Sequence, residues 1–210
     1  GRRVLAKIAS DPRFNQLLDY EASIFRKYGG DKRYQQTMPR LVDESLIEDN
    51  DRQYRANIFE YANEYLSLAE IIVAHPSGLD PRDAAWMGRR VLGLLLVARS
   101  MGLIHRAVVP DHILVHPISH DPIFLGWSHA TAAPESRLTM VSTANRWAYP
   151  PAGSFTEKSS VYMAGRVLMR LFGGNDERIG HLPATILAVL RSLVESSIDC
   201  GNAMDSYTTA

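Results

Sequence analysis

Lys7 and Glu21 are charged residues that lie in otherwise apolar stretches of the sequence. Lys7 interrupts an apolar run at residues 4–9, which predicts a short strand. Glu21 follows Phe14 by seven residues and precedes Ile24 by three, so it falls on the apolar face of a predicted helix. An unpaired charge there costs roughly several kcal/mol, so we expect the two side chains to form an ion pair. A position of Glu21 at the rim of that face, with its carboxylate in water, stays open as the alternative.

A second group of polar residues lies in a loop between a predicted apolar helix and a predicted apolar strand. The group consists of His105, Arg106, Asp111 and His112. Rigid elements on both sides of a loop are a typical way to present side chains for binding or catalysis. Spacings of four residues, as in helix-borne metal ligands, separate His112, His116 and His120. A strand and a turn are predicted at those positions, so we expect no zinc site.

Residues 105–112 resemble the catalytic loop of protein kinases, in which His-Arg-Asp is followed, five residues after the aspartate, by an asparagine. His105 and Arg106 match this motif. Ala107 stands in place of the aspartate that orients the acceptor hydroxyl, and His112 stands in place of the asparagine that binds a metal ion. The loop is therefore similar to that of a kinase whose catalytic positions are degenerate.

Two further motifs extend this resemblance. Lys7 and Glu21 are similar to the lysine of the Val-Ala-Ile-Lys strand and the glutamate of the following helix, which form an ion pair in kinases. Gly-Trp-Ser at residues 126–128 resembles Asp-Phe-Gly, with Gly126 in place of the aspartate that binds magnesium. Glycine offers no side-chain oxygen, and neutral imidazole is a poor ligand for this cation. The resemblance thus disfavours magnesium and leaves ATP as a candidate ligand.

The resemblance also implies a nucleotide-binding cleft and a phosphate-binding arginine. It assigns to the cleft Lys7, Glu21, the gatekeeper Phe59, and the hinge residues Glu60, Tyr61 and Ala62. Arg106 corresponds to an arginine that binds a phosphorylated activation segment, although simple packing of this side chain is an equally open reading. Hydroxyl residues of the matching segment are Thr131, Thr139, Ser142 and Thr143. Ser160 stands where an aspartate of kinases supports the catalytic loop.

The predicted fold class is α+β, and the resemblance implies a protein kinase-like two-lobed fold. It assigns a reduced N-terminal lobe to residues 1–62 and a mostly helical C-terminal lobe to residues 63–210. The expected elements are helices from Asp11, Asp80 and Ser159, hairpins at 39–61 and 113–125 with an acidic turn at 48–51 in the first, and a last helix at 183–197. Only six residues precede Lys7. The chain is therefore either a fragment of a longer protein or has a reduced small lobe.

Composition and charge disfavour several classes of protein. The 210 residues include 23 Lys and Arg and 23 Asp and Glu, a net charge of 0, which gives no general attraction to nucleic acid or anionic membranes. Cys200 is the only cysteine, so no intrachain disulfide forms. The apolar run at 91–98 is too short to span a bilayer, and no signal segment opens the chain. We expect a cytoplasmic protein that binds a protein partner or adjacent domains of its own chain.

These patterns favour a pseudokinase-like, non-catalytic regulatory or interaction domain of a longer protein that retains weak or metal-independent nucleotide binding. Two alternatives stay open. An atypical protein kinase or small-molecule phosphotransferase would use displaced residues, namely Asp111, Asp121 or His129. A purely structural domain would fill its cleft with its own side chains, such as Trp127 or Phe59.

Overall fold

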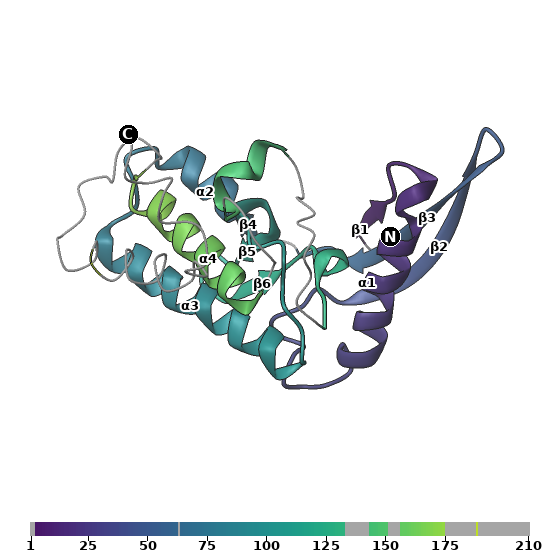
Figure 1. Cartoon of the computed structure of the whole chain (residues 1–210), viewed down its shortest axis with the longest axis horizontal. Helices are drawn as coiled ribbons and strands as arrows, with labels where there is room; N and C mark the ends of the chain where they lie inside the picture. The colour runs from purple at the N-terminus through teal and green to yellow at the C-terminus, as the bar shows by residue number, and fades with distance from the viewer. Residues whose placement is uncertain (1–2, 63, 133–142, 151–155, 175–187, 189–210) are drawn as a thin grey trace.

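The computed structural model of the chain describes residues 3–62, 64–132, 143–150, 156–174 and 188. These residues form a mixed α+β structure, which confirms the predicted fold class. A three-stranded sheet with one helix lies at one end of the molecule, and helices around a smaller sheet lie at the other (Figure 1). The predicted last helix at 183–197 lies outside the described residues, except for Ala188.

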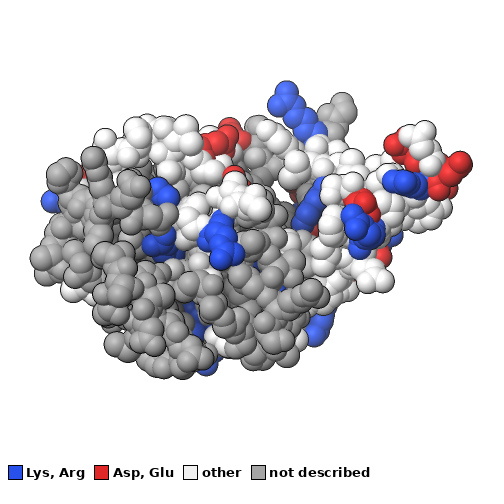
Figure 2. Space-filling view, turned by 45° about the horizontal axis from the view of Figure 1, so that its top comes forward, with Lys and Arg blue, Asp and Glu red and all other residues white. Residues whose placement is uncertain are grey.

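The first sheet is antiparallel and has the strand order β1-β3-β2. Its strands are β1 (Val4–Ile8), β2 (Leu41–Asp49) and β3 (Arg52–Glu60). Strands β2 and β3 are longer than predicted, because the chain reverses over Asn50 and Asp51 alone, both with positive φ (48° and 59°). Glu48 and Asp49, the first two residues of the predicted turn, therefore lie at the end of β2. This hairpin projects from the molecule, and acidic side chains lie at its tip (Figures 1 and 2).

Helix α1 (Asn15–Tyr28) packs against β3. Asp11 begins the segment as predicted, because its carboxylate accepts a hydrogen bond from the N–H of Arg13 at the start of a 3-10 helix (Pro12–Phe14). Phe14 belongs to this short helix and is 43% exposed, so its assignment to the buried face was wrong. The buried face of α1 consists of Leu18, Glu21, Ala22, Ile24 and Phe25.

The second part contains the helices α2 (Leu68–Ala74), α3 (Pro81–Ser100) and α4 (Glu157–Leu171). Its sheet has the order β4-β5-β6, with the strands β4 (Leu66–Ser67), β5 (Ile113–Val115) and β6 (Pro122–Phe124). The capping box of Ser67 with Glu70 begins α2, and Asp80 caps α3 as predicted. Helices α3 and α4 pack together over the main hydrophobic core. None of the helices in the described part of the chain combines the length and apolarity that a membrane crossing requires.

Hydrogen bonds join the two parts. The hydroxyl of Tyr28, at the end of α1, donates to the carbonyl oxygen of Met101 over 2.7 Å. The N–H of Phe124 in β6 donates to the carbonyl oxygen of Thr37 over 3.0 Å. The loop after α1 is thereby held against the smaller sheet, and the 3-10 helix that follows β6 (Trp127–His129) lies against α1.

Candidate functional site

The predicted ion pair between Lys7 and Glu21 forms. Nζ of Lys7 lies 2.7 Å from Oε1 of Glu21, whose side chain is 1% exposed. The carboxylate is buried because α1 places it against the inner face of β3, and a position at the rim of the helix face is therefore wrong. A buried carboxylate at this position needs both a counter-charge and hydrogen-bond donors.

Asn57 and Ser128 supply those further donors. Nδ2 of Asn57 donates to Oε2 of Glu21 over 3.1 Å, and the backbone N–H of Ser128 donates to Oε1 over 3.1 Å. Lys7 also donates to Oγ of Ser128 over 3.0 Å. Asn57 lies directly opposite Lys7 in the β1–β3 register. Neither residue was predicted from the sequence, because Asn57 is one of several polar residues in β3 and no local pattern indicated Ser128.

The 105–112 loop is held by hydrogen bonds from both sides. Nε2 of His105 donates to the carbonyl oxygen of Leu125 over 2.9 Å, and its ring stacks on Phe124 with centroids 4.4 Å apart. The hydroxyl of Ser160 donates to the carbonyl oxygen of His105 over 2.8 Å. Ser160 thus contacts the loop that the resemblance implies it supports. Ala107 and Arg106 are buried in this loop.

His112 and Gly126 face each other across the cleft. Gly126 has a φ of +76°, and a Cβ placed on it would lie 2.3 Å from Nδ1 of His112. The imidazole therefore occupies the space that a side chain at position 126 would need. Nδ1 of His112 is buried and has no hydrogen-bond partner among the described residues. The two predicted metal-ligand positions thus offer one imidazole nitrogen and no carboxylate, which does not fit magnesium.

A pocket of about 230 Å³ brings several predicted site residues together. Its lining includes Lys7, Glu21, Phe59, His112 and Gly126. Phe59 packs edge-to-face on Phe25, with ring centroids 5.1 Å apart, and forms the inner wall.

The hinge residues of the resemblance do not line this pocket. Glu60 donates its N–H to the carbonyl oxygen of Arg40 over 2.9 Å, the side chain of Tyr61 is exposed, and Ala62 is half-buried. Ala107 and Arg106 are also absent from its described lining.

The displaced residues considered for catalysis lie in different surroundings. Asp111 is exposed and accepts a hydrogen bond from Nδ2 of Asn145 over 3.3 Å. Asp121 pairs with Arg90 at 3.4 Å and lines a separate pocket. The ring of His129 lies 6.5 Å from that of His112. Trp127 does not line the cleft, because its ring packs in the core and its Nε1 donates to the carbonyl oxygen of Phe124.

The three evenly spaced histidines do not converge. His112 faces Gly126, His116 packs edge-on against Tyr65, and His120 packs edge-on against Trp86. Within the described ranges, no three His, Cys, Asp or Glu side chains are grouped as a metal site would require. Of the hydroxyl residues in the segment that matches an activation segment, Thr139 and Ser142 lie outside those ranges, Thr131 is buried and Thr143 is exposed.

Burial lowers the pKa values of His112, which lines the cleft, and of His105 and His129 nearby. Burial lowers the pKa of His105 to about 3. Burial and the charge of Lys7 lower the pKa of His112 to about 4, and burial and His112 lower the pKa of His129 to about 4. Among the described lining residues Lys7 is therefore the cationic group of this pocket, and the ring of His112 is neutral near pH 7.

The depressed pKa of His105 predicts a loss of stability in weak acid. The unfolded chain binds a proton near pH 6.5 and the folded chain only near pH 3, so stability is full above pH 6.5 and falls as the pH drops toward 3. His105 alone lowers the free energy of unfolding by about 2 kcal/mol between pH 7 and pH 5. Urea denaturation at both pH values measures this loss together with the losses from His112 and His129, and comparison with His105→Gln isolates the share of His105. His105→Gln reduces it, whereas His120→Gln, which removes an exposed ring, leaves it in place; an equal loss in both variants contradicts the assignment.

Comparison of the chain with models of known protein families and with curated proteins finds no match. The chemistry of the site is therefore what indicates a function.

Proposed function

We propose that this chain is a protein kinase-like domain that does not catalyse phosphoryl transfer. In this proposal residues 1–62 form a reduced small lobe and residues 63–210 a mostly helical large lobe. The order of motifs along the sequence supports it, as does the pocket in which Lys7 and Glu21 meet the segment after β6. The single observation that carries it is the contact between His112 and Gly126, which fills the place of a metal-binding carboxylate with an imidazole ring.

Phosphoryl transfer depends on positioning and on neutralising the charge of the phosphates, mainly through metal ions. Position 107, which would orient the acceptor hydroxyl, is a buried alanine. Loss of a general base alone lowers a rate by about 10²–10⁴-fold. Ala107, His112 and Gly126 affect separate parts of that mechanism, so their losses combine. The site retains the ion pair of Lys7 with Glu21, which can bind a phosphate, but it lacks the general base and the metal-binding carboxylate.

The proposed ligand of the cleft is a nucleotide that binds weakly and without magnesium. Lys7 supplies a cation for a phosphate, and Phe59 supplies an apolar wall. The pocket volume of about 230 Å³ is below the range of about 300–1,000 Å³ typical of small-molecule sites, which predicts weak affinity. The biological role then lies in contacts with a protein partner or an adjacent domain, with the nucleotide as a modulator.

Incubation with γ-labelled ATP, Mg²⁺ and mixed protein and small-molecule acceptors tests this proposal. We expect no transfer above that of a Lys7→Met variant. Transfer that is lost in Asp111→Asn or Asp121→Asn would instead establish a phosphotransferase that uses displaced carboxylates. Arg82→Gln, a substitution of an exposed residue at the start of α3, controls for nonspecific effects.

A further inference from the structure

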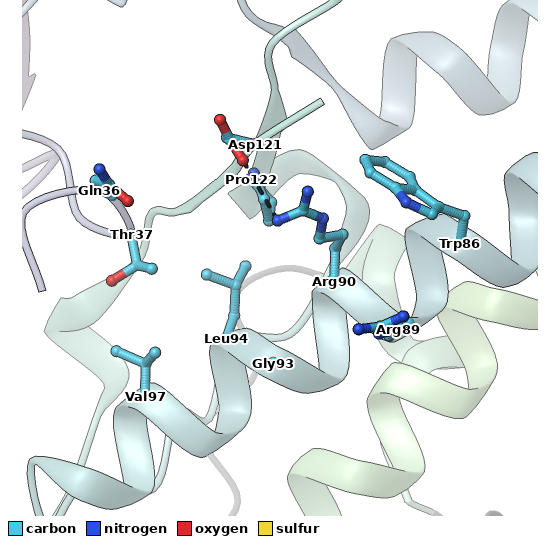
Figure 3. A pocket seen from close by; sticks show the side chains of 10 residues that line it. All are labelled: Gln36, Thr37, Trp86, Arg89, Arg90, Gly93, Leu94, Val97, Asp121 and Pro122. Carbon is cyan, nitrogen blue, oxygen red and sulfur yellow. Dashed lines mark ion pairs between the residues drawn. The ribbon is translucent and has the colours of Figure 1, made fainter. Parts of the chain in front are cut away.

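A second pocket lies on the outer face of α3, apart from the cleft. It has a volume of about 470 Å³ and is bounded by α3, by Gln36 and Thr37 of the loop after α1, and by Asp121 and Pro122 at the start of β6 (Figure 3). The residues that α3 contributes follow helical spacing along one face: Trp86, Arg89, Arg90, Gly93, Leu94 and Val97. Nothing in the kinase resemblance uses this pocket.

One end of the pocket is cationic and partly preorganised. The guanidinium of Arg90 lies over the ring of Trp86, 4.7 Å from its centroid, and pairs with Asp121 at 3.4 Å. Arg89 is exposed, and no acidic side chain of the described residues pairs with it. The charges of these lining residues sum to 2 − 1 = +1, so an anion placed here meets one fixed and one available guanidinium.

The other end of the pocket is apolar and open. Leu94 and Val97 point into it from α3, and Pro122 closes one side (Figure 3). Leu94 is buried and Val97 half-buried. A ligand that bridges both ends would therefore carry an acidic group next to an apolar one.

Gly93 leaves open space on this face of α3. Glycine inside a helix is destabilising relative to alanine, yet a Cβ on Gly93 would meet no atom within 4 Å. Gly88 on the same helix differs, because a Cβ there would lie 2.0 Å from Cδ2 of Leu168 in α4. Packing among the described residues thus accounts for Gly88 but not for Gly93, whose open surface forms part of the pocket.

We propose that this pocket docks an acidic peptide segment of a protein partner. A carboxylate of the peptide pairs with Arg89 beside the fixed Arg90. An adjacent apolar side chain of the peptide lies over Gly93 and against Leu94 and Val97. The charge of the pocket selects an acidic partner, and the missing side chain at Gly93 leaves space for the apolar side chain of the peptide.

Selection from random short peptides displayed on phage, followed by fluorescence anisotropy of the selected peptide, tests the proposal. We expect the selected peptides to combine Glu or Asp with an apolar residue. Replacing their carboxylates by amides, or introducing Arg89→Glu, raises the dissociation constant at least about tenfold. Arg82→Glu makes the same charge change on α3 outside the pocket and leaves the affinity unchanged. Selection of peptides without acidic residues overturns the proposal.

Gly93→Leu separates binding from folding. Because the space above Gly93 is open, we expect this variant to keep or raise the melting temperature while it weakens peptide binding about tenfold. Unchanged affinity in Gly93→Leu contradicts the site.

Two other occupants would give different results. Self-association that is lost in Arg89→Glu would assign the pocket to a second copy of the chain, whose acidic hairpin tip would be the occupant. Preferential binding of a labelled oligonucleotide would assign it to nucleic acid, and either result overturns the acidic-peptide proposal.

Discussion

Replacing Lys7 by methionine is expected to lower the free energy of unfolding by about 3 kcal/mol. The substitution removes the counter-charge of Glu21, whose side chain is 1% exposed and lies 2.7 Å from Nζ of Lys7. An uncompensated carboxylate then stays buried, and the donors left to it among the described residues are Nδ2 of Asn57 and the N–H of Ser128. Reversible denaturation in urea at pH 7 measures the loss.

A double-mutant cycle with Glu21→Leu isolates the pair. Glu21→Leu alone removes the acceptor of Lys7, Asn57 and Ser128 and destabilises the protein as well. Lys7→Met with Glu21→Leu removes both charges of the pair, so we expect its loss to be smaller than the sum of the single losses by about 1–2 kcal/mol. Arg40→Met is the control, because Arg40 and Glu60 form an exposed pair at 3.4 Å worth less than about 1 kcal/mol. Strict additivity would contradict the coupling.

Gly126→Asp, which introduces the residue of the Asp-Phe-Gly motif that residues 126–128 resemble, is expected to destabilise the fold by about 2–5 kcal/mol. Part of this cost arises from the φ of +76°, which disfavours a side chain. The larger part arises because the new Cβ would lie 2.3 Å from Nδ1 of His112. Urea denaturation of the variant measures the sum.

Gly102→Asp separates the two causes. Gly102 has a similar φ of +71°, but a Cβ there would meet no atom within 4 Å, so only the backbone cost of about 1–2 kcal/mol applies. In a His112→Ala background the contact is gone, and Gly126→Asp should then cost no more than Gly102→Asp. Equal costs at the two glycines in the unmodified chain would show that His112 does not exclude a side chain at position 126.

The sequence predicted those features of the site that depend on local pattern. Glu21 interrupts a helical apolar face, and a buried charge needs a partner, which the nearby apolar strand offers in Lys7. Asp11 and Asp80 marked the starts of helical segments because N-caps have a short-range chemical cause. The α+β class followed from the same periodicities, whereas the kinase-like arrangement of the lobes stays a proposal.

Features that depend on tertiary contacts were missed. Ser128 reaches Glu21 across 107 residues of sequence, and no local pattern encodes that distance. The close approach of His112 to Gly126 depends on how the 105–112 loop folds against the segment after β6. Phe14 was assigned to the buried face because the spacing rule does not register the 3-10 turn that precedes α1. The pocket beside Gly93 was also missed, because its far wall comes from the loop after α1 and from the start of β6.

The metal dependence of ATP binding tests the central claim most directly. That claim is that the cleft keeps the lysine–glutamate pair and has no carboxylate at the metal positions. Thermal unfolding with millimolar ATP should show a rise of about 2–4 °C that is the same in EDTA, Mg²⁺ and Mn²⁺, and that is lost in Lys7→Met. A rise that requires Mg²⁺ or Mn²⁺ would contradict the claim, since side-chain oxygens would then have to hold the ion.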